Sequence, residues 1–136
     1  MNSLEEGSVL QLDFSKLSRA VGTAPGILPV TVQNINTGEV ILLAYTNHQA
    51  FTLAVQKRCL ILWSTSRNAL WEKGKTSGET FELVEAYVNC EQNSLLYRVR
   101  PRGGGVCHTR NRANKPRNCF YRRINLNNLH LENIDP

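Results

Sequence analysis

Apolar and polar positions in the first half of the chain mark two strands joined by a tight turn. Segment 27–34, ILPVTVQN, is rich in β-branched and apolar residues, and segment 39–46, EVILLAYT, has the same character. Such runs are typical of strands, and the turn sequence Asn-Thr-Gly at 36–38 separates them. The pattern therefore predicts a β-hairpin over residues 27–46.

A helix is expected to follow this hairpin and to run to about Arg58. Its start, Thr-Asn-His-Gln, matches a capping box in which the Thr46 hydroxyl caps the first turn and Gln49 reaches back. A second, short helix is expected near 14–21. The buried stripe of the main helix is expected to contain Ala50, Phe51, Ala54 and Val55.

The second half of the chain contains further strand patterns. Segment 59–65, CLILWST, is very apolar and predicts a central strand, followed by a long polar loop over 66–79. Segments 81–90 and 94–100 predict another hairpin, and 119–124 predicts a last strand. Six strands with one or two helices indicate a β-rich α+β fold.

The ends of the chain are less patterned than its centre. Residues 1–26 are interpreted as an N-terminal extension, and the polar residues 125–136 as a frayed C-terminal tail. The N-terminus has acids where a signal peptide would have basic residues, and the longest apolar run, Val40 to Tyr45, is too short to cross a bilayer. We therefore expect a cytoplasmic protein with no membrane partner.

Charge is spread unevenly along the 136 residues, whose net charge is +5. Nine Lys or Arg and no Asp or Glu lie between Arg98 and Arg123. Such a block attracts anions, including the phosphates of a small molecule or of nucleic acid, although a charge run is more often a solvated face.

Four cysteines lie in this chain, and their spacing alone favours no metal site. Cys59, Cys90, Cys107 and Cys119 form no CxxC pair, and disulfides are not expected without signs of secretion. Two or three of them are compatible with buried, small apolar side chains.

The order of the motifs resembles the phosphoribosyl-AMP cyclohydrolase family of histidine biosynthesis. The similarity covers about 27–123 and is carried by GEVILLAYTN, LWSTSRNALWEKGKTSGE, VNCEQNSLLYRV, CHT and CFYRR. It implies a family-like domain over 27–124, with a small, mixed, barrel-like sheet, assembled as an intertwined homodimer. It also implies hydrolysis of the N1–C6 bond of N1-(5-phosphoribosyl)-AMP, a small nucleotide.

The resemblance implies a zinc site shared between two subunits. Cys90, from VNCEQN, would come from one subunit, and Cys107 and Cys119 from the other. Three thiolates leave the fourth position of a tetrahedral zinc open for water, whose pKa zinc lowers to roughly 7. Cys59 has no metal role in the family and is interpreted as a core thiol.

The resemblance also suggests the catalytic and substrate-binding residues. His108 is the candidate proton-transfer group, because its ordinary pKa lies near working pH. Glycines near the basic stretch would let backbone N–H groups approach phosphate. The candidate substrate-binding residues are Arg67, Trp71, Lys73, Thr76, Ser77, Gly103, Gly104, Thr109 and Arg122. For Trp71, packing beneath its loop is the favoured interpretation over stacking on a base.

Two features depart from the family pattern. The family has Asp-Cys-Asp-x-Asp, whose acids bind magnesium, where this chain has Asn89, Glu91 and Asn93 around Cys90. Amides in place of two carboxylates would bind magnesium more weakly, so a magnesium cofactor is doubtful.

The second departure is the link from Cys107 to Cys119, which is longer than the family's usual CHTGRRSC. Pro116 and Asn118 suggest a turn that would still let the two cysteines converge. These departures leave two alternatives open: a diverged relative that hydrolyses another nucleotide or modified base, and a non-enzymatic phosphate- or nucleic-acid-binding module.

Overall fold

A computed structural model describes residues 3–9, 26–75, 78, 80–102 and 107–136. Within these residues a six-stranded sheet has the order β4-β3-β2-β1-β6-β5, and β7 and β8 form a separate two-stranded sheet. The elements are α1 (Ser3–Glu6), β1 (Leu28–Asn34), β2 (Val40–Thr46), α3 (His48–Lys57), β3 (Ile61–Ser64), β4 (Ala69–Glu72), β5 (Phe81–Val88), β6 (Leu95–Pro101), β7 (Arg122–Ile124) and β8 (Leu131–Asn133).

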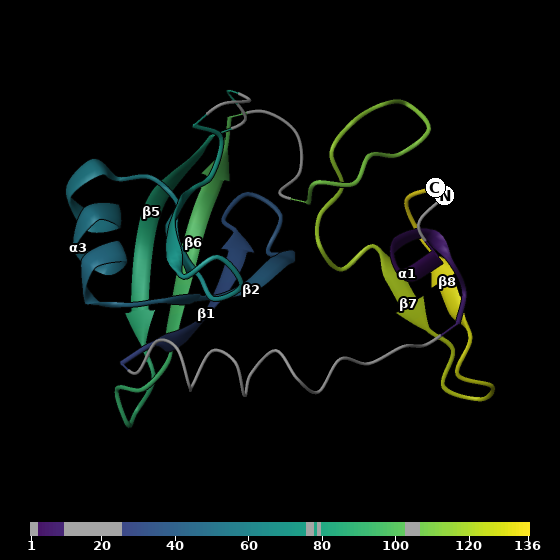
Figure 1. Ribbon diagram of the computed structural model, residues 1–136, viewed down its shortest axis with the longest axis horizontal. Coiled ribbons are helices and arrows are strands. Elements are labelled where there is room, and N and C mark those ends of the chain that lie inside the picture. The colour runs from purple at the N-terminus through teal and green to yellow at the C-terminus, as the bar shows by residue number, and fades with distance from the viewer. Residues whose placement is uncertain (1–2, 10–25, 76–77, 79, 103–106) are drawn as a thin grey trace.

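The sheet is mixed, as expected, because one central pair is parallel. Strands β1 and β6 run parallel, whereas β1–β2, β2–β3, β3–β4 and β5–β6 are antiparallel. The sheet curls around α3 (Figure 1), which gives the small β-rich α+β fold predicted from the sequence. The expected hairpins over 27–46 and 81–100 are both present.

The core lies between α3 and the inner face of the sheet. Val30 and Val32 on β1, Tyr97 on β6, and Ala50 and Ala54 on α3 are all completely buried. Because successive side chains on a strand point to opposite faces, the alternate residues of β1 and β6 face away from α3. Cys59 is partly buried and packs against this core, in agreement with its interpretation as a core thiol.

The start of α3 differs in detail from the prediction. Asn47, not Thr46, is the N-cap: its Oδ1 accepts a hydrogen bond of 2.9 Å from the N–H of Ala50. Thr46 instead donates its hydroxyl hydrogen bond to the Asn47 carbonyl. Both residue types are good caps, and the chain uses the one whose extended backbone directly precedes the helix. Phe51, expected in the buried stripe, is exposed.

Two further expectations are wrong. The loop over 66–79 contains the short strand β4, which pairs with β3 from Ile61↔Glu72 to Ser64↔Ala69. The tail is also structured, because β7 and β8 pair through Arg122↔Asn133, Arg123↔Glu132 and Ile124↔Leu131. The helix expected over 14–21 lies outside the described residues.

The two ends of the chain form a second lobe that stands apart from the main sheet (Figure 1). The N–H of Leu131 on β8 donates to the carbonyl of Ser8, just after α1, and the Tyr121 hydroxyl donates to the carbonyl of Glu5. The segment between β6 and β7 connects the lobe to the sheet. The described part of the chain contains no helix with the length and apolar character needed to cross a membrane.

Candidate active site

The link between Cys107 and Cys119 folds back on itself as an irregular hairpin. The Cys107 N–H donates to the Arg117 carbonyl at 2.7 Å, and the Arg117 N–H donates to the Thr109 carbonyl at 3.1 Å. An isolated bridge joins Arg110 to Pro116, and the turn is closed by the Asn111 N–H donating to Lys115. The two cysteines therefore converge, as the sequence predicted, despite the longer link.

The hairpin is fixed to strand β2 of the main sheet at its second cysteine. The Cys119 N–H donates to the Ile41 carbonyl at 2.9 Å, and the Asn118 amide donates to the Glu39 carboxylate at 2.7 Å. Because Ile41 lies on β2, this attachment holds the thiol pair beside the strand.

Cys107 has the properties of a thiolate. Its pKa falls to about 5, first because Cys119 is hydrogen-bonded to it and further because Thr109 donates to the same sulfur. The Thr109 hydroxyl lies 3.1 Å from Cys107 Sγ and its N–H 3.5 Å, whereas burial opposes the shift. Since thiolates are the form of cysteine that binds metals, these residues supply two soft donors.

An open cavity of about 550 Å³ lies against this thiol pair. Strand β2 contributes one wall, β3 and the turn after it another, and the hairpin a third. The lining residues are Leu42, Leu43, Ala44, Tyr45, Trp63, Ser64, Thr65, Ser66, Arg67, Trp71, Lys73, Cys107, His108 and Cys119. The structure thus gathers Arg67, Trp71, Lys73 and His108, all candidates from the sequence, around Cys107 and Cys119.

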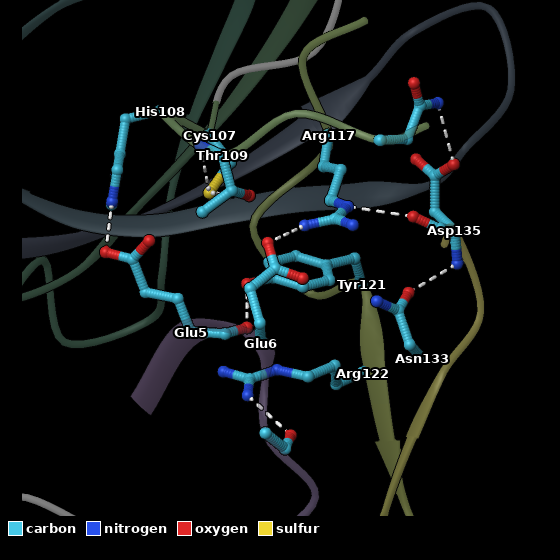
Figure 2. Close-up of polar contacts among 12 residues, drawn as sticks. Glu5, Glu6, Cys107, His108, Thr109, Arg117, Tyr121, Arg122, Asn133 and Asp135 are labelled. Carbon is cyan, nitrogen blue, oxygen red and sulfur yellow. Dashed lines mark hydrogen bonds and ion pairs between the residues drawn. The ribbon is translucent and has the colours of Figure 1, made fainter. Parts of the chain in front are cut away.

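His108 projects from the hairpin with its side chain 76% exposed. Its Nε2 lies 2.5 Å from Oε1 of Glu5 on α1 (Figure 2). This hydrogen bond raises the pKa of His108, although burial opposes the shift. Glu5 had not been predicted, because α1 is 103 positions away along the chain and carries no motif.

The other candidates lie in different places. Trp71 packs partly against the core and also lines the cavity, which accords with the packing interpretation. Thr109 is buried behind the Cys107 sulfur, and Arg122 donates to the Gly7 carbonyl in the second lobe. Thr76, Ser77, Gly103 and Gly104 lie outside the described residues. Ser64, Thr65 and Ser66, from the LWSTS segment, also line the cavity, although they are not among the residues predicted from the sequence.

Cys90 is exposed in the turn between β5 and β6, away from the other two cysteines. It precedes β6, whereas Cys107 follows the other end of that seven-residue strand. In the described parts of a single chain, no three His, Cys, Asp or Glu side chains are grouped closely enough to hold a metal ion.

The cysteines fit zinc as two ligands per chain, with a third required from elsewhere. The turn at Cys90, by contrast, is a poor fit for magnesium. Asn89 Oδ1 accepts from the N–H groups of Asn93 and Ser94, at 2.8 and 2.9 Å. Its Nδ2 donates to Asn93 Oδ1 at 2.6 Å, so both amides are engaged within the turn. Only the exposed Glu91 contributes a carboxylate there.

Together, the fold and the site define a small, β-rich α+β protein with two thiols and a histidine beside an open cavity. Residues 42–121 match the model of the phosphoribosyl-AMP cyclohydrolase family, and the chain belongs to that family.

Similar proteins support this assignment. The chain is 43% identical over 122 residues to a phosphoribosyl-AMP cyclohydrolase of Caulobacter vibrioides, covering 89% of this chain and 78% of the relative. It is 40% identical over 116 residues to that of Cenarchaeum symbiosum, covering 85% and 95%. It also matches the histidine biosynthesis bifunctional protein HisIE of Thermus thermophilus, with 43% identity over 73% of this chain and 44% of the relative.

Proposed function

We propose that this protein is a zinc-dependent phosphoribosyl-AMP cyclohydrolase that opens the adenine ring of N1-(5-phosphoribosyl)-AMP at the N1–C6 bond in histidine biosynthesis. The observation that carries the proposal is the Cys107–Cys119 thiol pair beside His108 at the mouth of the cavity, in a chain of this family.

Cys107, Cys119 and Cys90 would hold the zinc ion. When bound by three thiolates, zinc keeps one coordination position open and supplies an activated water. The Thr109 hydroxyl, which donates to Cys107 Sγ at 3.1 Å, keeps that sulfur in its charged form and fixes its orientation. His108 borders the same space and would move the proton as the ring nitrogen leaves.

The chain's own side chains also suit a nucleotide. Trp63, Trp71 and Tyr45 give the cavity flat apolar walls for a base, and Ser64 and Ser66 also line it. Pockets of this kind, apolar with a few convergent polar groups, are typical of small-molecule sites.

A homodimer is part of this proposal, since the described part of one chain does not group Cys90 with the other two cysteines. A second copy has an apolar surface to occupy on the outer face of the sheet. Leu43, Thr31, Leu96 and Tyr87 form one row across β2, β1, β6 and β5 as cross-strand neighbours. Leu43 and Tyr87 are about half exposed, and Leu43 also lines the cavity. A partner seated on this row would therefore lie next to the site.

The second lobe adds to the argument for an intertwined dimer. It carries large apolar side chains that a single chain leaves in solvent: Phe120, Ile124, Leu126, Leu129 and Ile134. Their exposed fractions run from 38% to 88%, more than an isolated lobe of this size would favour. Packing against a partner would bury them.

The test is turnover of N1-(5-phosphoribosyl)-AMP by the purified protein, together with its zinc content and its mass in solution. We expect about one zinc per subunit, a dimer, and activity that is lost on chelation and recovered with zinc. A zinc-loaded, dimeric protein that leaves this substrate unchanged would overturn the assigned reaction.

One observation favours a second function on the same scaffold. The amide-bearing turn and the longer basic link both differ from the family pattern, and the link carries Cys107, His108 and Cys119, which line the cavity. A diverged hydrolase of another nucleotide would bind zinc as a dimer yet show activity only when other nucleotides with modified bases are supplied.

A further inference from the structure

A second cavity adjoins the first and has a different character. Its volume is about 420 Å³, and it shares Arg67, Trp71, Lys73, Cys107 and His108 with the larger one. The thiol and the histidine therefore lie where the two cavities meet, with the aromatic and hydroxyl-lined space on one side and the second cavity on the other.

Cations line the second cavity from two directions. Lys73 and Lys75 follow β4 on one wall, and Arg110 comes from the opposite wall, on the hairpin that joins the two cysteines. Among the described residues that line this cavity, Arg67 brings the number of Lys and Arg side chains to four, and the one acid is Glu72. The Glu72 carboxylate pairs with Lys57 at 3.9 Å and accepts from Cys59, so it is already engaged by groups outside the cavity.

Arg110 is an exposed residue whose guanidinium is anchored by a backbone contact. Its Nη1 donates to the Asn114 carbonyl at 3.0 Å, within a turn closed by Asn111 and Lys115. The turn thus holds the guanidinium at the wall of the cavity. A planar, fixed guanidinium is the side chain best suited to bidentate contact with a phosphate.

We propose that this second cavity binds a phosphomonoester end of the substrate and that Arg110 is a specificity-determining residue for it. The inference rests on the proposed function, which supplies a substrate with a phosphorylated ribose on each side of the base. With the base in the aromatic cavity and the reacting bond at Cys107 and His108, one phosphorylated ribose extends into the cationic cavity. The longer link is then part of substrate recognition, because it carries Arg110.

Binding of ribose 5-phosphate to the zinc-loaded protein, measured by calorimetry at low salt, tests the cavity without requiring turnover. Ribose serves as the uncharged comparison. Arg110→Gln should weaken ribose 5-phosphate binding about tenfold, the loss expected for one charge-assisted hydrogen bond. Lys75→Gln, on the opposite wall, should weaken it in the same direction, and Arg110→Lys should retain part of the affinity.

Arg112→Gln is the matched control, because Arg112 is exposed on the same hairpin but is not among the residues lining the cavity. It should change binding less than about twofold, as expected for diffuse, screened attraction. For N1-(5-phosphoribosyl)-AMP, Arg110→Gln should raise KM with little change in kcat. Unchanged melting temperatures would exclude unfolding of the hairpin as the cause.

Two outcomes would overturn the inference: equal weakening by Arg110→Gln and Arg112→Gln, or ribose 5-phosphate binding no tighter than ribose in the unmodified protein. The proposed function fails separately. If ribose 5-phosphate binds with the predicted dependence on Arg110 while N1-(5-phosphoribosyl)-AMP is not hydrolysed, the phosphate cavity stands and the assigned reaction does not.

Discussion

Glu5 Oε1 lies 2.5 Å from Nε2 of His108, so the N-terminal helix and the cysteine-bearing hairpin meet at the candidate active site. Further contacts hold this arrangement (Figure 2): the Tyr121 hydroxyl donates to the Glu5 carbonyl, and Arg117 pairs with Glu6 at 2.6 Å. The carboxylate therefore reaches the histidine on a helix that is itself fixed to the second lobe.

Glu5→Gln should lower kcat for N1-(5-phosphoribosyl)-AMP about tenfold and leave KM nearly unchanged. A positioned proton-transfer group contributes roughly 10²–10⁴-fold to a rate, and loss of the group that orients it removes part of that factor. Steady-state kinetics at saturating zinc provide the measurement.

Ser3→Ala serves as the control, since Ser3 is exposed on the same helix. If Glu5→Gln and Ser3→Ala have the same kcat as the unmodified protein, the Glu5 contact has no role in catalysis and only joins the two lobes.

Mixing two inactive variants tests whether the zinc site is shared between chains. Cys90→Ala and Cys107→Ala should each lose zinc, because each removes a ligand from both sites of a symmetric dimer. After subunit exchange, a heterodimer should regain one intact site, since one chain then supplies Cys107 and Cys119 and its partner supplies Cys90. Zinc content and turnover of the mixture are the measurements.

Cys59→Ala is the control for thiol loss, because Cys59 packs against the core and donates to Glu72. It should keep its zinc. Verified exchange of subunits with no recovery of zinc or activity would mean that the three cysteines do not meet across two chains.

Local patterns were sufficient to predict much of the sheet but not the second lobe. The strands β1, β2, β5 and β6 carry many apolar residues between turn residues, and their hairpins were predicted directly from the sequence. Strand β4 has only four residues between polar turns, too few to show a periodic pattern. Strand β8 is equally hidden, since it has only three residues and they lie in an asparagine-rich segment.

One contact of the candidate site could be predicted from the sequence, and another could not. Convergence of Cys107 and Cys119 was predicted, because Pro116 lies in a link that can reverse direction. The Glu5–His108 contact was not, since it depends on how two lobes pack and not on local sequence. Long-range pairs of this kind leave no period or spacing for single-sequence reasoning to detect.

Stability should depend on pH through Glu6 and Arg117. Arg117 is 3% exposed, donates to the carbonyl of Asp135 and lies over the Tyr121 ring. Its ion pair is with the Glu6 carboxylate, which therefore balances most of its charge. The hydrogen bond that the Glu6 carboxylate accepts from Arg117 lowers the pKa of Glu6 from its ordinary value. A lowered carboxyl pKa stabilises the folded state above the unfolded pKa, and this contribution is lost as pH falls through the folded value.

Glu6→Gln should therefore lower the melting temperature near neutral pH, and the difference from the unmodified protein should shrink as the pH falls below about 4. Glu132→Gln, which breaks the exposed Arg123–Glu132 pair of 3.3 Å on the same lobe, should have little effect at either pH. Thermal unfolding across this pH range is the measurement. A Glu6→Gln difference that stays constant down to pH about 3 would contradict a role for the Glu6 charge.

The turn at Cys90 leads to the last prediction, which concerns magnesium. The Asn89 and Asn93 side-chain amides are joined by a hydrogen bond of 2.6 Å and carry no charge, so they need no cation to neutralise them. Carboxylate charge largely offsets the cost of removing water from magnesium, and Glu91 provides only a single charge. We expect zinc-dependent activity that responds little to magnesium up to about millimolar levels.

Replacing Asn89, Glu91 and Asn93 together by Asp should reverse both properties. The triple variant loses the Asn89 Nδ2 donor and places three carboxylates in one turn, so without magnesium it should melt at a lower temperature than the unmodified protein. Magnesium should bind it in calorimetric titration and restore its melting temperature, whereas the unmodified protein should show neither effect. Gln92→Glu, which adds a charge to the same turn outside these positions, controls for charge alone. Tight magnesium binding by the unmodified protein, with activity abolished when magnesium alone is removed, would show that Glu91 and the amide oxygens suffice as ligands.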